Sequence, residues 1–428
     1  MIKKFVPLLA VALSQVFASP AFAQSHFDTG NTAWMLTSSA LVFLMTIPGV
    51  ALLYAGFVRK KNAISIAMQV FITVCVVTVA WAVIGYSLAF THGGTINDFI
   101  GGLDKLALKG VFKNSPVGTI PESVYIMFQL AFACITVALI TGAFAERIKF
   151  TSFVLFILLW TFCVYVPIVH WVWGGGFLAK REVLDFAGGT VVHINAGTAG
   201  LVCAITLGKR YNFGRERMEA YNPILALTGT AFLWIGWFGF NAGSAIAANA
   251  SAGMAMLVTQ IAASAAALTW MFTEAAVYRR ISVIGVLSGS IAGLVAITPG
   301  SGYVDPLGAL VIGLMAGLLC FLASTVIKRM LKYDDPMDVF GVHAVGGITG
   351  SILTGVFATK SIGNASGLID GNPMQVFIQF QGVMMTIIWS ACMTLVILLI
   401  VNLITGLRVN RKTELEGLDI HMHGEALS

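Results

Sequence analysis

Hydrophobic positions follow one another in runs about as long as the roughly 20 residues that a helix needs to cross a bilayer. Arg, Lys, Gly, Pro or Asn interrupt the chain between these runs. The pattern therefore predicts membrane-spanning helices. We place eleven of them, at about 33–58, 64–90, 121–145, 150–170, 190–208, 223–243, 251–277, 282–298, 306–328, 338–358 and 374–406.

The composition agrees with this pattern. Charged residues make up 10% and hydrophobic residues 58% of the 428 residues, whereas an ordinary soluble domain has about 25% charged residues. A soluble fold cannot cover its surface with so few charges. The chain is thus expected to be an all-α polytopic membrane protein.

The first 23 residues resemble a secretory signal peptide. Lys3 and Lys4 are followed by an apolar core over 5–17 and by a small-residue motif at 21–23, the order of features that such peptides share. The mature chain would then begin at Gln24, outside the cytoplasm. The alternative is an additional transmembrane helix.

Basic residues in the loops predict the orientation. Short cytoplasmic loops are enriched in Lys and Arg, and 17 basic residues lie on one side of the predicted spans against 6 on the other. The six are Lys105, Lys109, Lys113, Lys180, Arg181 and Lys360. The mature N-terminus is therefore predicted outside and the C-terminus in the cytoplasm. The distribution also accounts for the net charge of +6 without a basic patch for nucleic acid.

Two histidines share a local sequence frame. His193 and His343 both stand in VHxxxGxxG, within the fifth and tenth predicted spans. Ionisable residues at membrane depth are rare and mark functional sites by default. An offset of five spans reverses the orientation in the membrane, which is the arrangement of an inverted repeat with a site between its halves. A chance match in a glycine-rich chain is the alternative.

The repeat suggests a domain organisation. A transmembrane domain over 24–406 would hold inverted five-helix halves at about 33–208 and 223–358, followed by an extra C-terminal helix at about 374–406. A cytoplasmic tail would occupy 407–428, either solvated or ordered against the membrane domain.

An aspartate precedes each histidine, namely Asp185 and Asp338. We expect both to cap helix starts, where backbone N–H groups need acceptors and the helix dipole favours negative charge. Small residues allow membrane helices to approach closely. The glycines of the two frames are therefore expected to bring spans five and ten together; they are Gly197, Gly200, Gly347 and Gly350.

No enzyme, cofactor or metal signature accompanies these features. The six cysteines fall in apolar spans without CxxC spacing, and neither HExxH nor GxSxG occurs. His421 and His423 in the tail are only two ligands, too few for a zinc site. We therefore expect neither enzymatic activity nor a metal site.

Several segments resemble the Amt/Mep/Rh ammonium transporter family, and its bacterial Amt members in particular. They extend from the third span to the tail and read FQLAFACITVALITGAFAERIKF, HWVWGGG, LDFAGGTVVHINAG, GWFGFNAGSA, DDPMDVFGVH and EGLDIHMHGE. The resemblance implies transport of ammonium or ammonia, and of methylammonium as an analogue, across the inner (plasma) membrane. It also implies a homotrimer regulated at the cytoplasmic face by a PII-type signalling protein.

The resemblance also implies roles for individual residues. An outer ammonium-binding site would consist of Phe132, Trp173 and Ser244, and a gate of Phe132 and Phe240. His193 and His343 would line the pore below the gate. Asp185 would support the outer site.

The chemistry of these residue types fits that role. Aromatic rings attract a cation but do not compensate for its full desolvation, whereas neutral ammonia crosses an apolar path at much lower cost. A membrane ammonium sensor and an ion-coupled secondary transporter of another small solute are the alternatives. The second predicts broken helices and charged ligands within the spans.

Overall fold

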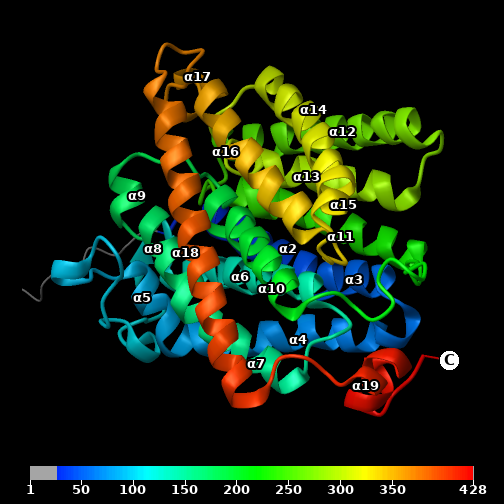
Figure 1. The fold of residues 1–428 in the computed structure, drawn as a ribbon. Coiled ribbons are helices and arrows are strands. Elements are labelled where there is room, and N and C mark those ends of the chain that lie inside the picture. The colour runs from blue at the N-terminus through cyan, green and yellow to red at the C-terminus, as the bar shows by residue number, and fades with distance from the viewer. Residues whose placement is uncertain (1–26, 428) are drawn as a thin grey trace, which may run out of the picture.

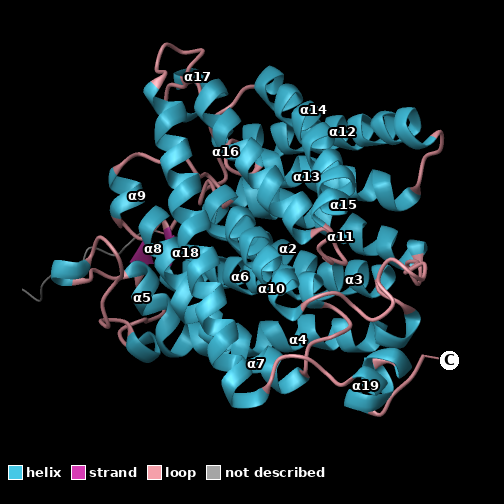
Figure 2. Ribbon diagram, in the orientation of Figure 1, coloured by secondary structure: helices cyan, strands magenta, loops and turns pink. Residues whose placement is uncertain are grey.

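The computed structural model describes residues 27–427, and the predicted signal peptide lies outside this range. The described chain is a bundle of long helices (Figure 1), and Figure 2 shows strand only in one small hairpin. The spans consist of the following elements: α2 (Thr29–Leu44), η1 (Met45–Val50) and α3 (Ala51–Phe57); η2 (Lys60–Asn62), α4 (Ala63–Ala80), η3 (Trp81–Gly85) and α5 (Tyr86–Phe90); α6 (Glu122–Ile140) and η6 (Thr141–Phe144); α7 (Phe150–Trp160), η7 (Thr161–Tyr165), α8 (Val166–Val172) and α9 (Phe177–Lys180); η8 (Gly189–Ile194) and α10 (Asn195–Leu207); α11 (Pro223–Gly243); α12 (Ala250–Tyr278); α13 (Val283–Ile297); α14 (Pro306–Leu322), η9 (Ala323–Ile327) and α15 (Lys328–Leu331); η10 (Phe340–Ala344) and α16 (Val345–Phe357); and α18 (Met374–Thr405).

The remaining elements lie in the loops and the tail. They are the short 3₁₀ turns η4 (Gly94–Ile96) and η5 (Leu106–Leu108), the antiparallel strands β1 (Pro116–Val117) and β2 (Ile120–Pro121), and α17 (Lys360–Gly363), α19 (Arg411–Glu416) and η11 (Asp419–His423).

The predicted spans are confirmed as helices. Within the described residues, ten apolar helices of 18 residues or more are long enough to cross a membrane. The remaining predicted span, the eighth, corresponds to α13, which has 15 residues. Caps explain several helix starts: Asn222, Asn249 and Asp305 each accept a hydrogen bond from a first-turn backbone N–H.

Both histidines lie in π-helical turns, one at the start of the fifth span (η8) and one at the start of the tenth (η10). The fourth and ninth spans also share such a turn, η7 and η9. Single π-helical turns are uncommon and often occur at functional sites. These two pairs recur five spans apart, whereas η1 and η3 in the first two spans have no counterpart in α11 and α12.

The last long helix, α18, runs along the outside of the bundle (Figure 1) and contacts elements of both halves. Its Ser390 hydroxyl donates to the carbonyl of Asn195 on α10. Its Gln379 amide donates to the carbonyl of Ser351 on α16. The helix outside the repeat therefore binds both histidine-bearing helices and links them to each other.

The tail is packed against the start of the second span. Asp419 accepts hydrogen bonds from the backbone N–H groups of Ile64 and Ser65, and the N–H of Leu418 donates to Asn62. Burial raises the pKa of Asp419, although these N–H groups oppose the rise. Of the two sequence interpretations of the tail, the structure agrees with the ordered one.

Candidate functional site

A cavity of about 300 Å³ opens where α8 and α11 end, and we call it the vestibule and this end of the bundle the outer end. Phe132, Trp173 and Ser244 all line it, although they come from three separate spans. The structure thus brings together the three residues that the sequence assigned to a cation site. The other lining residues are Tyr125, Phe128, Gln129, Val172, Phe186 and Ile246.

Hydrogen bonds fix the polar groups of the vestibule. The indole Nε1 of Trp173 donates to the carbonyl of Asp185 at 2.9 Å, which holds the indole in place. The Ser244 hydroxyl donates to the carbonyl of Phe240 at 2.9 Å. Because its proton is used in this way, the Ser244 oxygen is left as an acceptor for a cation.

Two stacked phenylalanines close the floor of the vestibule. The rings of Phe132 and Phe240 lie 4.2 Å apart at 26°, and Trp173 meets Phe132 edge-on at 5.6 Å. Both phenylalanines are buried. The two residues predicted to form a gate therefore lie in direct contact between the vestibule and the interior.

His193 lies directly below this ring pair. Its imidazole is 5.9 Å from the Phe240 ring and stacks on Trp237 at 5.4 Å. The Trp237 indole is held in turn by a hydrogen bond from its Nε1 to the Thr298 hydroxyl. A continuous row of rings thus leads from the vestibule to the first histidine.

His343 lies beside His193. The Nδ1 atoms of the two rings are 3.4 Å apart and the rings are nearly parallel, with centroids 5.5 Å apart at 19°. Both side chains are buried. The Nε2 of His193 is buried without a hydrogen-bond partner among the described residues, so it is free to bind a small polar molecule.

Glycines allow this approach. A Cβ on Gly197 would lie 2.2 Å from the backbone N of Ala344, and one on Gly347 would lie 2.9 Å from the Ile194 side chain. A Cβ on Gly200 would meet the Val339 side chain. Gly197 faces Ala344, whereas Gly200, further along the same helix, faces the earlier residue Val339. The two helices therefore run antiparallel, as an inverted repeat requires. Gly350 differs from the prediction, because it faces Ala296 on α13.

Asp185 caps the first histidine-bearing helix. Its carboxylate accepts hydrogen bonds from the backbone N–H groups of residues 188, 189, 190 and 191, and from the Thr190 hydroxyl. Gly188 has φ of +113°, which an L side chain rarely adopts. The capping expected of Asp185 is confirmed, and it fixes both η8 and the carbonyl that holds Trp173.

Asp338 does not take the matching position in the second half. Its carboxylate pairs with Lys328 at 2.6 Å, whereas Asp335 accepts from the backbone N–H of Phe340 at the start of η10. Asp335 lies eight residues before His343, as Asp185 lies eight before His193. The expected capping is therefore corrected from Asp338 to Asp335.

A buried ion cluster joins the two histidine-bearing helices at the opposite, inner end. Arg210, which follows α10, binds Asp334, which precedes η10, through two hydrogen bonds of 2.8 and 2.9 Å. Glu146 pairs with Arg210 and Arg59. Burial alone would raise the pKa of Glu146, but Arg210 and Arg59 outweigh it and hold the pKa below its ordinary value. The cluster fixes the inner ends of both helices.

Three of these contributors were not assigned a site role from the sequence: Trp237, Asp335 and Arg210. Trp237 lies three residues before Phe240 on one helix, a spacing that places both on one face. The eight-residue spacing from the histidine would have indicated Asp335. Arg210 was counted only as a loop charge, and the sequence holds no signal for its partner Asp334 across 124 residues.

Comparisons with known proteins show which family the chain matches. The family model described as Ammonium Transporter Family matches residues 33–427. An ammonium transporter of Aquifex aeolicus is 50% identical over 413 residues, covering 96% of both chains. One of Bacillus subtilis is 44% identical over 400 residues, covering 92% of this chain and 98% of the relative.

Solved structures of other proteins are also similar to this chain. The crystal structure of Saccharomyces cerevisiae Mep2 is similar with a TM-score of 0.84 and 37% identity, over 90% of this chain and 91% of that one. A structure titled Sensor Amt Protein is similar with a TM-score of 0.86 and 31% identity, over 92% of this chain and 98% of that one.

Proposed function

Because the chain belongs to the ammonium transporter family, we propose that it recruits ammonium at the vestibule and conducts ammonia past His193 and His343. The ion gives up its proton at the phenylalanine pair to the imidazoles of these two histidines, which relay it. Ammonium transport by a multi-pass membrane protein follows from the family. The route through the protein is our proposal. The observation that supports it is the continuous row from Trp173 and Ser244 through Phe132 and Phe240 to the histidine pair.

The vestibule can attract a cation without removing it fully from water. A cation facing aromatic rings gains about 0.5–2 kcal/mol, and the Ser244 oxygen adds one acceptor. Burying an unpaired ion costs far more than these contacts return. The intact ammonium ion therefore stops above the phenylalanine pair.

Neutral ammonia passes this barrier much more easily, because it carries no net charge to desolvate. Potassium has no proton to lose, so the same barrier rejects it. Selectivity then follows from acid–base chemistry as well as from size. Below the ring pair, ammonia forms hydrogen bonds with the histidine pair, since an imidazole both donates and accepts hydrogen bonds. The unpartnered, buried Nε2 of His193 offers such a contact.

The surroundings of the pore belong to the same proposal. The basic loops favour an inner-membrane protein with its vestibule outside and its tail in the cytoplasm. The family resemblance supports a homotrimer, and it supports a PII-type protein as the partner at the inner end. The ordered tail, held by Asp419, offers such a partner a fixed surface.

Sensing is the second candidate function. The observation that favours it is the similarity to the structure titled Sensor Amt Protein. A sensor and a transporter share the recruitment of the cation but differ in turnover. Sustained transport by the purified chain therefore separates the two.

The experiment is transport by the purified full chain in proteoliposomes. Internal pH and membrane current are recorded together after an ammonium gradient is applied. Vesicles with folded protein should respond, and protein-free vesicles should not. Equal responses from the two would overturn the proposal.

A further inference from the structure

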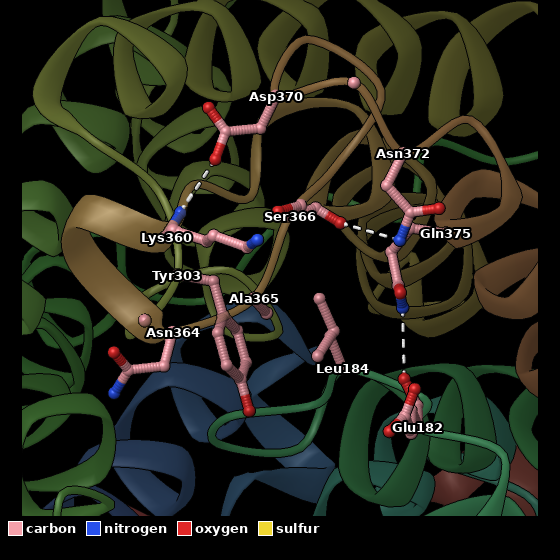
Figure 3. A pocket seen from close by; sticks show the side chains of 12 residues that line it. Glu182, Leu184, Tyr303, Lys360, Asn364, Ala365, Ser366, Asp370, Asn372 and Gln375 are labelled. Atoms are coloured by element: carbon pink, nitrogen blue, oxygen red, sulfur yellow. Dashed lines mark hydrogen bonds between the residues drawn. The ribbon is translucent and has the colours of Figure 1, made fainter.

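A second and larger cavity, of about 650 Å³, lies at the outer end beside the vestibule. Its walls come from residues 182–184, Tyr303 and the loop that surrounds α17 (Figure 3). Phe186 separates the two cavities, because it lines the vestibule while its ring meets Tyr303 edge-on at 5.8 Å. The volume lies in the range of pockets for small molecules, about 300–1,000 Å³.

Hydrogen bonds hold the walls of this outer pocket in place. Gln379 is fully buried and bonds both the N–H and the carbonyl of Leu184. Gln375 donates to the carbonyl of Glu182 at 3.0 Å, and Asn372 donates to the carbonyl of Ser366 at 3.2 Å. A pocket with fixed walls binds ligands with less loss of conformational entropy.

Three exposed side chains of opposite charge line the pocket, namely Lys360, Glu182 and Asp370. Neither Lys360 Nζ nor the Glu182 carboxylate has an ion pair or a hydrogen bond within the described chain, although both line the cavity. The Asp370 carboxylate accepts from the backbone N–H of Lys360, which leaves its second oxygen available. In Figure 3 the Lys360 side chain lies between Asp370 on one side and Glu182 on the other.

This arrangement selects for a ligand that carries both charges. A lone anion would meet Glu182 and Asp370, and a lone cation would meet Lys360, so each would face repulsion as well as attraction. We propose that the outer pocket binds a small zwitterion of the amino-acid type, with its carboxylate at Lys360 and its ammonium group at Asp370. The proposal stands apart from transport, because binding is measured on its own.

Calorimetric titration of the purified full chain in detergent tests the site. The probe is L-serine, and the competitors are glycerate, which lacks the ammonium group, and ethanolamine, which lacks the carboxylate. L-serine should bind saturably. Neither competitor should displace much of it at equal concentration, because each offers only one of the two charged contacts.

Two variants remove one charge each with little change in side-chain size: Lys360→Gln and Asp370→Asn. Each should weaken L-serine binding about tenfold or more, since a hydrogen bond between charged groups is lost. Lys113→Gln is the matched control, because Lys113 is exposed and does not line the pocket. It should bind as the wild type does.

Three outcomes would overturn the proposal. One is the absence of saturable L-serine binding by folded protein up to about 10 mM. Another is displacement of L-serine by glycerate or ethanolamine at equal concentration. The third is wild-type affinity in both charge-removal variants, which would place the binding elsewhere on the protein.

Discussion

The Nδ1 atoms of His193 and His343 face each other at 3.4 Å, although the residues lie 150 positions apart in the chain. In a neutral pair only one of these two nitrogens can carry the proton, so one ring donates and the other accepts. The donating ring then has a bare Nε2, and the accepting ring has a protonated one. The pair therefore presents one acceptor and one donor, which suits a molecule such as ammonia that both donates and accepts.

Close helix contact at Gly197 is required to bring the histidines together. Gly197→Ala would place a Cβ 2.2 Å from the Ala344 backbone, so the helices must separate. We expect a loss of about 1–3 kcal/mol in stability, as for overpacked cores, together with reduced ammonium uptake. Thermal unfolding in detergent and uptake by proteoliposomes measure the two effects.

Gly253→Ala is the matched control for this prediction. Gly253 is also helical, but an added Cβ there meets nothing within 4 Å. This variant should unfold and transport as the wild type does. If Gly197→Ala behaved in the same way as Gly253→Ala, the close approach of the two helices would not matter for the pair.

Loss of the Asp185 carboxylate should destabilise the vestibule and η8 together. Asp185→Ala leaves the N–H groups of residues 188 to 191 without their acceptor, and each buried donor left unsatisfied costs about 1–3 kcal/mol. Asp185→Asn should lose less, because one oxygen remains. The order of melting temperatures should therefore be wild type, then Asn, then Ala.

Asp338→Asn provides the comparison, since the Asp338 carboxylate bonds the Lys328 side chain and Asn tolerates the positive φ at this position. Its melting temperature at pH 7 should fall less than that of Asp185→Asn. A larger loss at Asp338 than at Asp185 would contradict the assignment of the capping role to Asp185.

Removing either polar or aromatic contact in the vestibule should change the concentration dependence of transport. Trp173→Leu loses a cation–π contact of about 0.5–2 kcal/mol, which corresponds to an increase of about 2-fold to 30-fold in the half-saturating ammonium concentration. Ser244→Ala loses an acceptor and should act in the same direction. Phe112→Leu, at an exposed loop position, should have no effect. Unchanged half-saturation in both vestibule variants would count against the cation site.

Stability should depend on pH through Asp338. Burial raises the pKa of its carboxyl from 3.8 to about 6, although Lys328 opposes the rise. A raised pKa favours the folded state below pH 3.8, and that contribution is lost as the pH rises through about 6. Asp338→Asn removes this titration, and Asn tolerates the φ of +53° at this position.

The melting temperature of Asp338→Asn relative to the wild type should therefore increase between pH 5 and pH 7, an interval that includes the folded pKa of about 6. A relative melting temperature of Asp338→Asn that fell over this interval would have the wrong sign for a raised pKa.

Most of the fold could be predicted because a bilayer imposes a length and a polarity on each span. The hydrophobic runs therefore located helices such as α11 and α12 to within one residue at each end. The local frame around His193 and His343 also indicated the repeat correctly. Each of these signals is local in the sequence.

The rest depended on contacts between distant residues. The charge on Arg210 is visible in the sequence, but its pairing with Asp334 depends on how two helices end in space. Asp338 is the aspartate nearest to His343 in the sequence and was therefore expected to cap the helix. The actual cap, Asp335, has the same eight-residue spacing to its histidine as Asp185 has in the first half. Both histidines lie in π-helical turns, and the pattern of hydrophobic residues in the sequence does not reveal such turns.

Replacement of both histidines tests the central claim most directly. His193→Leu with His343→Leu removes every polar atom of the pair while keeping the path apolar. We expect ammonium uptake by proteoliposomes to fall by at least about tenfold, as the loss of a buried hydrogen-bonding contact predicts. The measurement is the initial ammonium-driven current and internal pH change, with potassium tested at the same concentration. A double variant that kept the wild-type rate and the wild-type rejection of potassium would contradict the proposal that ammonia passes along the histidine pair.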